Sequence, residues 1–420
     1  MQCLTKSGIC MPAQNTFSER YALNLIEKYI TNIGGRAPGS SEESKCATLI
    51  ADELKRYCDC VYIEPFDVHP DAFLGYIPIV LSLYLIGFFV WPYLPIFSFL
   101  MAILAFVIFY KEFFQYEEFI DPLFPKKKSQ NVIGEFKVSD NYRNIVIVSG
   151  HHDSAYEFRL LAKSPYLYIL SIISGMASLM LFLFMTASWA FLISLSVLGQ
   201  VQTAYFLSLV SNLWYILLIM LPFVLPLFFF KSSRAVPGAV DNLSAVSIVI
   251  SIARTLRTLI ENGFKLENTR VMCISFGSEE AGLRGSRRFV EKHLNELKSK
   301  KTYVLNMDTL ADPHSLSVVV EEKTTRTRHS RKLIEALIKI ANKLQMPLNI
   351  ISLPSFGGGT DAVPFSWAGI DATTFFGAEL SLKTFSFYHT MRDTPDKINP
   401  QVLRLTHDII IEFIKNLEKE

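Results

Sequence analysis

The sequence predicts an α/β domain, a mostly parallel sheet covered by helices on both faces, with two transmembrane helical hairpins inserted into it. Apolar, β-branched runs alternate with helical patterns along most of the chain. Two long segments, 39 residues at 72–110 and 67 residues at 164–230, contain no Asp, Glu, Lys, Arg or His. The other 314 residues carry all the charged side chains, about one quarter of their number, which is the usual share in a soluble domain.

The composition excludes two classes of protein. Of the 420 residues, 50% are hydrophobic and the net charge is +2, so the chain is too apolar and too weakly charged to be intrinsically disordered. With 41 Lys and Arg against 39 Asp and Glu, it has no basic excess for binding nucleic acid.

The six cysteines predict no disulfide framework, and Cys58 and Cys60 lack the C-x-x-C spacing. Residues 1–20 are polar and predict no signal peptide.

Each of the two uncharged segments predicts two membrane spans. Residues 74–110 fit two short spans, near the lower end of the range of about 17–25 residues per span. Trp91, Pro92 and Tyr93 at the middle favour a turn with interfacial aromatic rings. Residues 166–230 separate His151 from Asp241, which we assign below to one metal pair, so this segment must cross an even number of times. Because four spans need at least about 68 residues before any turn, we expect two, with the far turn at 199–202.

These spans divide the chain into five parts. Residues 1–72, 111–163 and 231–420 form the globular domain, and 73–110 and 164–230 form the hairpins. Positive side chains lie on the globular side of the membrane ends, while the two far turns have none. They are Lys111, Lys126, Lys127, Lys128, Arg159, Lys163, Lys231 and Arg234. Since positive residues favour the cytoplasmic side, we predict an integral membrane protein of about four spans whose domain faces the cytoplasm.

The globular segments supply the alternation in order. Ser40 and Glu43 have capping-box spacing before a helical pattern at 47–54. Residues 61–63 and Phe66 predict a strand. Residues 144–148 are typical of a strand buried on both faces.

The second half continues the same alternation. It predicts the helix 245–259, the strand 271–276, the helix 284–297, the strands 303–305 and 316–320, and the helices 330–344 and 401–417. In a parallel sheet with helices on both faces, ligands bind at the carboxyl ends of the strands. Polar residues should therefore gather there.

Five polar clusters lie just after strands or in loops, at residues 150–154, 237–242, 278–286, 306–308 and 388–394. Taken singly, each is a weak signal, because a strand-end histidine, a Glu pair or an Asp-Asn turn is usually solvated surface. Taken together, two His, two Asp and paired Glu are the side chains of a two-metal hydrolase. Imidazole and carboxylate ligands together suit zinc.

At these residues the sequence resembles the di-zinc aminopeptidase family, which includes bacterial leucyl aminopeptidase, plasma glutamate carboxypeptidase and glutaminyl cyclase. The resemblance follows the globular segments in order and extends to residues 36–40 and 358–361. It implies an α/β sandwich around a mixed eight-stranded sheet. It also implies a membrane-anchored zinc exopeptidase, most of all an aminopeptidase, that acts on peptides.

The resemblance further implies the metal ligands. His151, Asp308 and a bridging Asp241 would hold one zinc ion. Glu280, His389 and the same Asp241 would hold the second. Two zinc ions per chain would polarise the scissile carbonyl and share a bridging hydroxide.

Neighbouring residues have supporting roles in the same family. Glu279 would be the general base, which takes a proton from the bridging water and passes it to the leaving amine. Asp153 would orient His151, whereas His152 should point away, because adjacent side chains on extended backbone alternate. Asp361 is expected near the substrate pocket. Asp393 is expected either to support the loop of His389 or to be a turn residue.

Two departures from the family and three other functions remain open. Ala245 stands where members often have glycine, and soluble members lack the hairpins. A glutaminyl cyclase-like acyltransferase would use the same fold with one zinc ion. A non-catalytic receptor would have lost ligands, and none is lost. A transporter usually has ionisable residues inside the membrane, and the two inserts have none.

Overall fold

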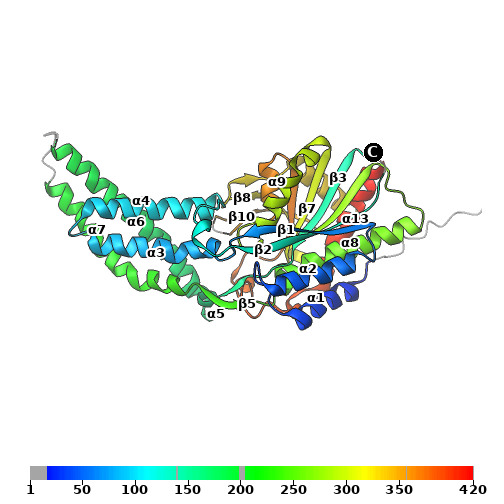
Figure 1. Ribbon diagram of the computed structural model, residues 1–420, viewed down its shortest axis with the longest axis horizontal. Coiled ribbons are helices and arrows are strands. Elements are labelled where there is room, and N and C mark those ends of the chain that lie inside the picture. Colours follow the sequence, from blue (N-terminus) through cyan, green and yellow to red (C-terminus); the bar gives the residue numbers. More distant parts are fainter. Residues whose placement is uncertain (1–16, 139–140, 198–203, 356, 420) are drawn as a thin grey trace, which may run out of the picture.

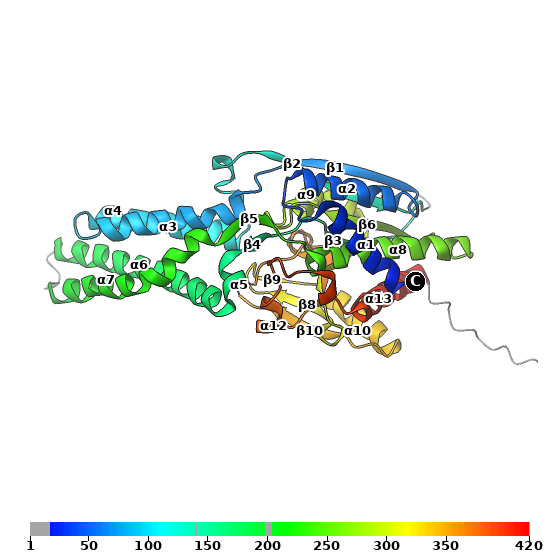
Figure 2. The same cartoon turned by 90° about the horizontal axis from the view of Figure 1, so that it is seen from below.

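The computed structural model describes residues 17–138, 141–197, 204–355 and 357–419. Figure 1 shows two regions, a sheet with helices packed on it and the long helices α3 (Ala72–Val90), α4 (Pro95–Phe109), α6 (Pro165–Val197) and α7 (Ala204–Val224), which extend from one end of this domain. In the view turned by 90°, these helices again leave the domain on one side, with α3 beside α4 and α6 beside α7 (Figure 2). The chain therefore separates into a sheet domain and a helical extension.

The sheet is mixed and mostly parallel, as predicted. Four neighbouring strands in its centre, in the order β6, β3, β7 and β11, are parallel, whereas β1–β2, β2–β6 and β11–β8 are antiparallel pairs. Eight strands form the row and β9 (Thr327–Arg328) pairs with β8 at its side. In spatial order the row is β1 (Cys60–Val68), β2 (Lys127–Glu135), β6 (Thr269–Phe276), β3 (Asn144–His151), β7 (Lys301–Leu310), β11 (Asp371–Gly377), β8 (Ser317–Glu322) and β10 (Asn349–Leu353).

Helices cover both faces of the sheet because successive side chains of a strand point to opposite faces. In β3, Val146 and Val148 belong to one buried cluster and Ile145 and Ile147 to another. The first face packs against α1 (Glu19–Ile33), α2 (Ser41–Leu54), α8 (Ser244–Glu261), α10 (Arg331–Lys343) and α13 (Pro400–Lys419). The second packs against α9 (Arg284–Ser299) and α11 (Ala362–Trp367).

The elements predicted in the globular segments are all present, with ends that differ by a few residues. Periodicity missed α1, β2, β10 and β11. The capping-box expectation was half correct. Ser40 accepts a hydrogen bond from the Glu43 amide (3.1 Å), but the Glu43 carboxylate accepts from the amide of Gly39 (2.8 Å) and turns toward the end of β6.

Among the described residues, five segments are long and apolar enough to cross a membrane, by length and composition. Four belong to the helical extension, in which α3 pairs with α4 and α6 with α7. The fifth, residues 239–261, contains α8 and is 72% buried, against 22–39% for the other four. Trp91 to Tyr93 lie between α3 and α4 as expected, whereas the far turn predicted at 199–202 lies outside the described residues.

The helix pairs pack against each other through aromatic rings. The Trp214 ring on α7 stacks on Phe88 of α3 at 4.8 Å, and its Nε1 donates a hydrogen bond to the Phe88 carbonyl (3.1 Å). Gly87 permits this close packing, since a Cβ atom there would lie 2.8 Å from the ring of Phe182. The two pairs form one packed unit in this way.

A small two-stranded sheet connects the second pair to the domain. β4 (Tyr156–Phe158) and β5 (Lys231–Ala235) pair antiparallel on the two sides of the α6–α7 insertion, and α5 (Arg159–Lys163) follows β4. Lys231 Nζ lies 3.0 Å from Asp71 Oδ1 at the start of α3. Both helix pairs are therefore joined where they meet the domain.

Candidate metal centre

The central parallel strands bring most of the predicted site residues to one edge of the sheet. His151 ends β3 and Asp308 lies near the end of β7. Glu279 and Glu280 follow β6, and His389 lies in the connection after β11. Because β6, β3, β7 and β11 are parallel neighbours, their carboxyl ends lie at the same edge of the sheet and bring these side chains together.

Asp241 reaches the same edge from the start of α8. The turn before it needs glycine at 238, where φ is 59°. A Cβ atom on Gly238 would lie 2.6 Å from the Asp241 carbonyl and 2.8 Å from Arg36 Nη2. The peptide bond between Asp241 and Asn242 is cis.

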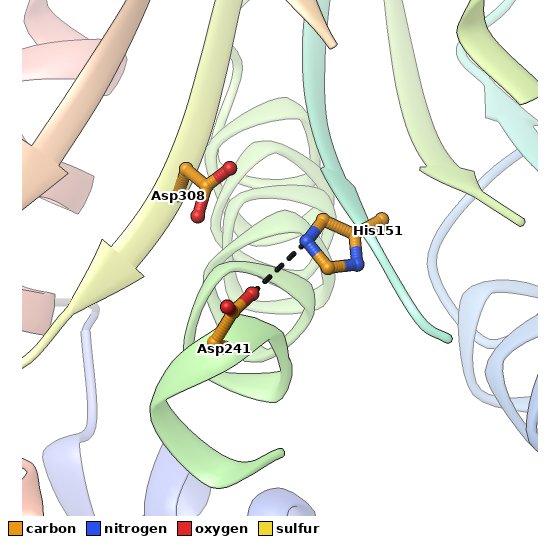
Figure 3. Close-up of side chains that lie close together, drawn as sticks. All are labelled: His151, Asp241 and Asp308. Carbon is orange, nitrogen blue, oxygen red and sulfur yellow. Dashed lines mark ion pairs between the residues drawn. The ribbon is translucent and has the colours of Figure 1, made fainter. Parts of the chain in front are cut away.

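Each oxygen of the Asp241 carboxylate faces a different histidine. Oδ1 lies 3.2 Å from His151 Nε2, and Oδ2 lies 3.2 Å from His389 Nε2. Figure 3 shows the first of these contacts, with Asp308 beside the pair. His151, Asp241 and Asp308 form one group of possible ligands, and Asp241, Glu280 and His389 form another, each with its ligand atoms within 4.8 Å of one another. Asp241 is common to both groups.

The donor set fits divalent metal ions. Asp241, Asp308, Glu279 and Glu280 place four carboxylates in one poorly exposed site, and buried carboxylates need a compensating cation. Burial raises the pKa of Asp308 to about 8, and the charge of Asp241 adds to this effect. Burial alone would lower the pKa of His389, but Glu280 and Asp241 raise it to about 10. The electrostatic potential of the site is thus strongly negative. Imidazole and carboxylate groups together are ligands that suit zinc.

Glu279 lies beside the two groups and belongs to neither. Its Oε2 is 3.7 Å from His151 Nε2. Burial raises the pKa of Glu279 well above its ordinary value, and Glu280, Asp361 and Asp308 raise it further, while His151 opposes them. A carboxyl group of this kind can hold and release a proton near neutral pH.

Asp153 holds the Glu279–Glu280 segment. Its two oxygens accept hydrogen bonds from the amides of Glu279 (3.1 Å) and Glu280 (3.0 Å). Its Oδ1 also lies 3.4 Å from His151 Nδ1. Asp153 therefore fixes the backbone of the glutamate pair as well as facing His151.

His152 points away from the cluster, as the alternation predicted. Its Nδ1 lies 2.9 Å from the Ser275 hydroxyl in the interior of the domain. Burial lowers the pKa of His152 to about 4. This histidine is therefore neutral at physiological pH and structural.

Asp393, expected to support the His389 loop or to be a turn residue, supports the segment of Val240 and Asp241 instead. Its carboxylate accepts hydrogen bonds from the amides of Val240 (2.7 Å) and Asp241 (3.2 Å). It therefore positions the bridging candidate Asp241, although it follows His389 by four residues in sequence. Asp361 is fully buried at the start of α11, directly after Thr360, whose amide donates to Glu322 (2.9 Å).

Sequence reasoning missed two supporting residues. The Arg36 side chain is fully buried and donates hydrogen bonds to the carbonyls of His152 (2.7 Å), Pro237 (2.7 Å) and Gly238 (3.1 Å). Glu43 accepts from the amide of Ser278 (2.7 Å), the residue before the glutamate pair. The arginine of the 36–40 motif was the available signal, but these three carbonyls lie more than 100 residues away in sequence.

A cavity of about 770 Å³ opens beside this centre. Asp241, Glu279, Glu280, Asp308 and His389 line part of its wall, and Thr360 lies in the same wall. Asp361, which was expected near the substrate pocket, is not among the lining residues, whereas its neighbours Gly358, Gly359 and Thr360 are. The cluster therefore faces a space in which a ligand can bind.

Sequence comparison finds peptidases among the proteins that this chain resembles. Residues 228–414 match the profile of Peptidase family M28. Aminopeptidase YwaD of Bacillus subtilis is 30% identical over 186 residues, which are 44% of this chain and 38% of that protein. A glutamate carboxypeptidase 2 homolog of Caenorhabditis elegans is 29% identical over 178 residues, 38% of this chain and 23% of that protein. The matches thus span well under half the length of these relatives.

Solved structures share the fold at low sequence identity. BSAP, a zinc aminopeptidase from Bacillus subtilis, has a TM-score of 0.53 at 18% identity and covers 96% of both chains. A glutaminyl cyclase from an Acidobacteriales bacterium has a TM-score of 0.56 at 14% identity and covers 99% of both. These findings confirm the predicted fold class and the predicted resemblance to zinc aminopeptidases. The expected enzyme class, a zinc metallopeptidase, agrees with the matched family.

Proposed function

We propose that this chain is a membrane-anchored, zinc-dependent exopeptidase of the aminopeptidase type. The observation that carries the proposal is the shared carboxylate, Asp241, whose two oxygens face His151 and His389 separately. Such an arrangement suits two metal ions about 3.5–4 Å apart. The match of residues 228–414 to Peptidase family M28 supports the same function.

Five side chains would hold the zinc ions. His151, Asp241 and Asp308 would bind one ion, and Asp241, Glu280 and His389 would bind the other. Bound zinc would polarise the scissile carbonyl and make water a better nucleophile at neutral pH. Asp153 and Asp393 position these ligands through the backbone amides that they bind.

Glu279 is the proposed proton carrier. Its carboxylate is free of both ligand groups and lies in the cavity wall. It would take a proton from the attacking water as the C–O bond forms, and deliver it to the leaving nitrogen as the C–N bond breaks. The products are a carboxylic acid and an amine, so atoms and charge balance.

The lining of the cavity favours a substrate amine over a substrate carboxylate. None of the described residues that line it is Lys or Arg. A carboxypeptidase site needs a cation for the terminal carboxylate of its substrate. The described lining offers no such cation, which supports the aminopeptidase assignment.

Glu279→Gln tests the proposal directly. We expect hydrolysis of a leucine amide to fall by about 10²–10⁴-fold, the usual contribution of a general base, with two zinc ions still bound per chain. Metal content is measured by elemental analysis and activity by release of the free amine. Glu291→Gln, an exposed change on α9, is the matched control. Activity that survives both Glu279→Gln and chelation would refute the proposal.

A glutaminyl cyclase is the second candidate, because glutaminyl cyclases share the fold. This alternative predicts one zinc ion per chain and cyclisation of an N-terminal glutamine. A measured stoichiometry of one, together with ring closure of a glutaminyl peptide, would replace the peptidase proposal. Two ions and amide hydrolysis would exclude it.

The membrane part of the proposal comprises four spans. They are α3 and α4 in the hairpin predicted at 73–110, and α6 and α7 in the hairpin predicted at 164–230. Their apolar side chains are widely exposed, as suits contact with lipid. Segment 239–261 is a core helix instead, because most of it is buried in the domain. The positive residues at the span ends support a cytoplasmic position of the domain. Labelling of an engineered surface cysteine from outside intact cells would contradict this side.

A further inference from the structure

The cavity beside the candidate metal centre extends between the two helix pairs. One part of its wall carries the proposed zinc ligands, and the other part is formed by apolar side chains of α3 and α6. Ile77 and Val80 lie on the α3 side, and Ile172 and Met176 lie on the α6 side. A single space therefore joins polar groups that can cleave an amide to the helices proposed to lie in lipid.

Aromatic contacts make this wall continuous. The Phe158 ring in β4 lies 4.4 Å from the ring of His389 and 4.5 Å from that of Phe230, at the end of the second helix pair. The amide of Phe158 also donates a hydrogen bond to the His389 carbonyl (2.9 Å). On the other side, Phe73 at the start of α3 lies 5.0 Å from Tyr116, and both line the cavity.

The cavity is also open between the helices. Ile173 and Met180 line it, yet they are 59% and 40% exposed on the surface of α6. A ligand could thus enter sideways, from the apolar layer around the helices.

The chemistry of the helical wall selects among ligands. An extended peptide would leave its backbone N–H and C=O groups without partners between apolar side chains, which costs several kcal/mol per group in an apolar medium. A helix about 10–12 Å across would fill about 770 Å³ within one to two turns. A hydrocarbon chain has no such groups to satisfy and is flexible enough for the space.

We propose that the substrates are amides that carry a long hydrocarbon chain, and that this chain lies between α3 and α6 while the scissile carbonyl reaches the metal centre. The polar end of the substrate is neutral or cationic, because no described lining residue is Lys or Arg. The reaction is hydrolysis, with water as the co-reactant, and it rests on the proposed function. The C–N bond breaks, the acyl carbon gains the water oxygen, and the amine leaves with a proton.

A chain-length series tests the preference. The substrates are coumarylamides of 2-amino acids with unbranched alkyl side chains of two to ten carbons, so the free amine and the reporter group stay constant. Below their micelle concentration, we expect kcat/KM to rise by up to about fourfold for each added CH₂, because each buried methylene is worth about 0.8 kcal/mol. A flat or falling series on active enzyme overturns the proposal, as does preference for an apolar tripeptide over its alkyl counterpart.

Two variants locate the chain in the cavity. Met176→Trp and Ala177→Trp add bulk at lining positions, and each should lower the ratio of long-chain to short-chain kcat/KM by about tenfold or more. Two positions are used because one variant could disturb packing. Phe184→Trp, at an exposed position of α6 outside the lining, is the matched control and should keep the wild-type ratio. Unchanged ratios in both lining variants would overturn the assignment.

A binding measurement separates this proposal from the proposed function. The metal-free full chain in nanodiscs is irradiated with a long-chain amide that carries a diazirine at its hydrocarbon end. Labelled peptides from residues 72–84 and 168–180 support the proposal even if every amide hydrolysis assay fails. Labelling confined to the outward surface of the helices, and equal in Met176→Trp and wild type, overturns it even if leucine amide is hydrolysed.

Discussion

The sheet domain and the helical extension contain helices of similar composition in different surroundings. The segment with α8 has a mean hydropathy of 1.6 and the four others 2.0–2.2, so composition alone separates them poorly. Burial separates them well, because 72% of the α8 window lies inside the domain against 22–39% for the others. An apolar helix is thus a core helix or a proposed span according to what covers it. The predictions below test this division.

The largest effect is expected in the domain, from Asp241→Asn. Asparagine keeps the size of the side chain but removes the charge that both ligand groups share. We expect kcat/KM to fall by about 10³-fold or more, because a catalytic metal supplies several kcal/mol, and zinc content to fall to one ion or none. Asp52→Asn, an exposed change on α2, is the control. If zinc content stayed at two, Asp241 would not be the shared ligand.

The next effect is expected in the helical extension, from Phe184→Arg. Phe184 is 61% exposed near the middle of α6, and an arginine at the centre of a span costs about 2.5–3.5 kcal/mol in insertion. The inserted fraction is measured by carbonate extraction of membranes. Ile350→Arg, at an exposed position of the sheet domain, should stay within about 0.5 kcal/mol of wild type. Equal tolerance at both positions would contradict the membrane assignment of α6.

A smaller effect is expected from Asp393→Asn. One amide-accepting oxygen is lost from the side chain that holds Val240 and Asp241. Residues that support a ligand in this way usually contribute about 10–100-fold to metal affinity, so zinc should bind that much more weakly in competition with a chromophoric chelator. The exposed neighbour Asp396→Asn should bind zinc like the wild type. Unchanged affinity in Asp393→Asn would show that the loop holds its shape by other contacts.

The smallest effect is expected where the two regions meet, from Lys231→Met. The Lys231–Asp71 pair is partly exposed, and such pairs contribute about 0–1 kcal/mol. The unfolding midpoint in detergent should fall by a few degrees at most, and less in high salt. Lys265→Met removes an exposed pair of the sheet domain and serves as the reference. A loss of several kcal/mol would mean that this junction holds the molecule together.

Much of the fold could be predicted because its signals are local. The β-branched run at 144–148 and the uncharged segments needed no long-range information, and the ends of the parallel strands then placed the polar clusters. Strands such as β2, which begins with lysines, and β11, with two threonines, carry weaker patterns and were missed.

The supporting contacts of the site could not be predicted because they connect distant segments. Asp393 was expected to support the neighbouring His389 loop or to be a turn residue, but the amides that its carboxylate binds are 152 and 153 residues away in sequence. Glu43 fits a local capping pattern and also reaches Ser278, 235 residues away. Spacing in sequence reveals side chains that share a strand end. It does not reveal which backbone amides a buried carboxylate will meet.

The place of the α6–α7 pair within the chain has a consequence for biogenesis. The ribosome releases His151 first, then the whole of this apolar pair, and only afterwards Asp241, Glu280, Asp308 and His389. β4 and β5 close the base of the pair, and the β4 amide at Phe158 holds the His389 carbonyl. If the pair spans the membrane as proposed, the ligand set assembles only after the chain has crossed and returned to the same side. On the proposed function, amide-cleaving activity would then arise only in molecules that have already been inserted.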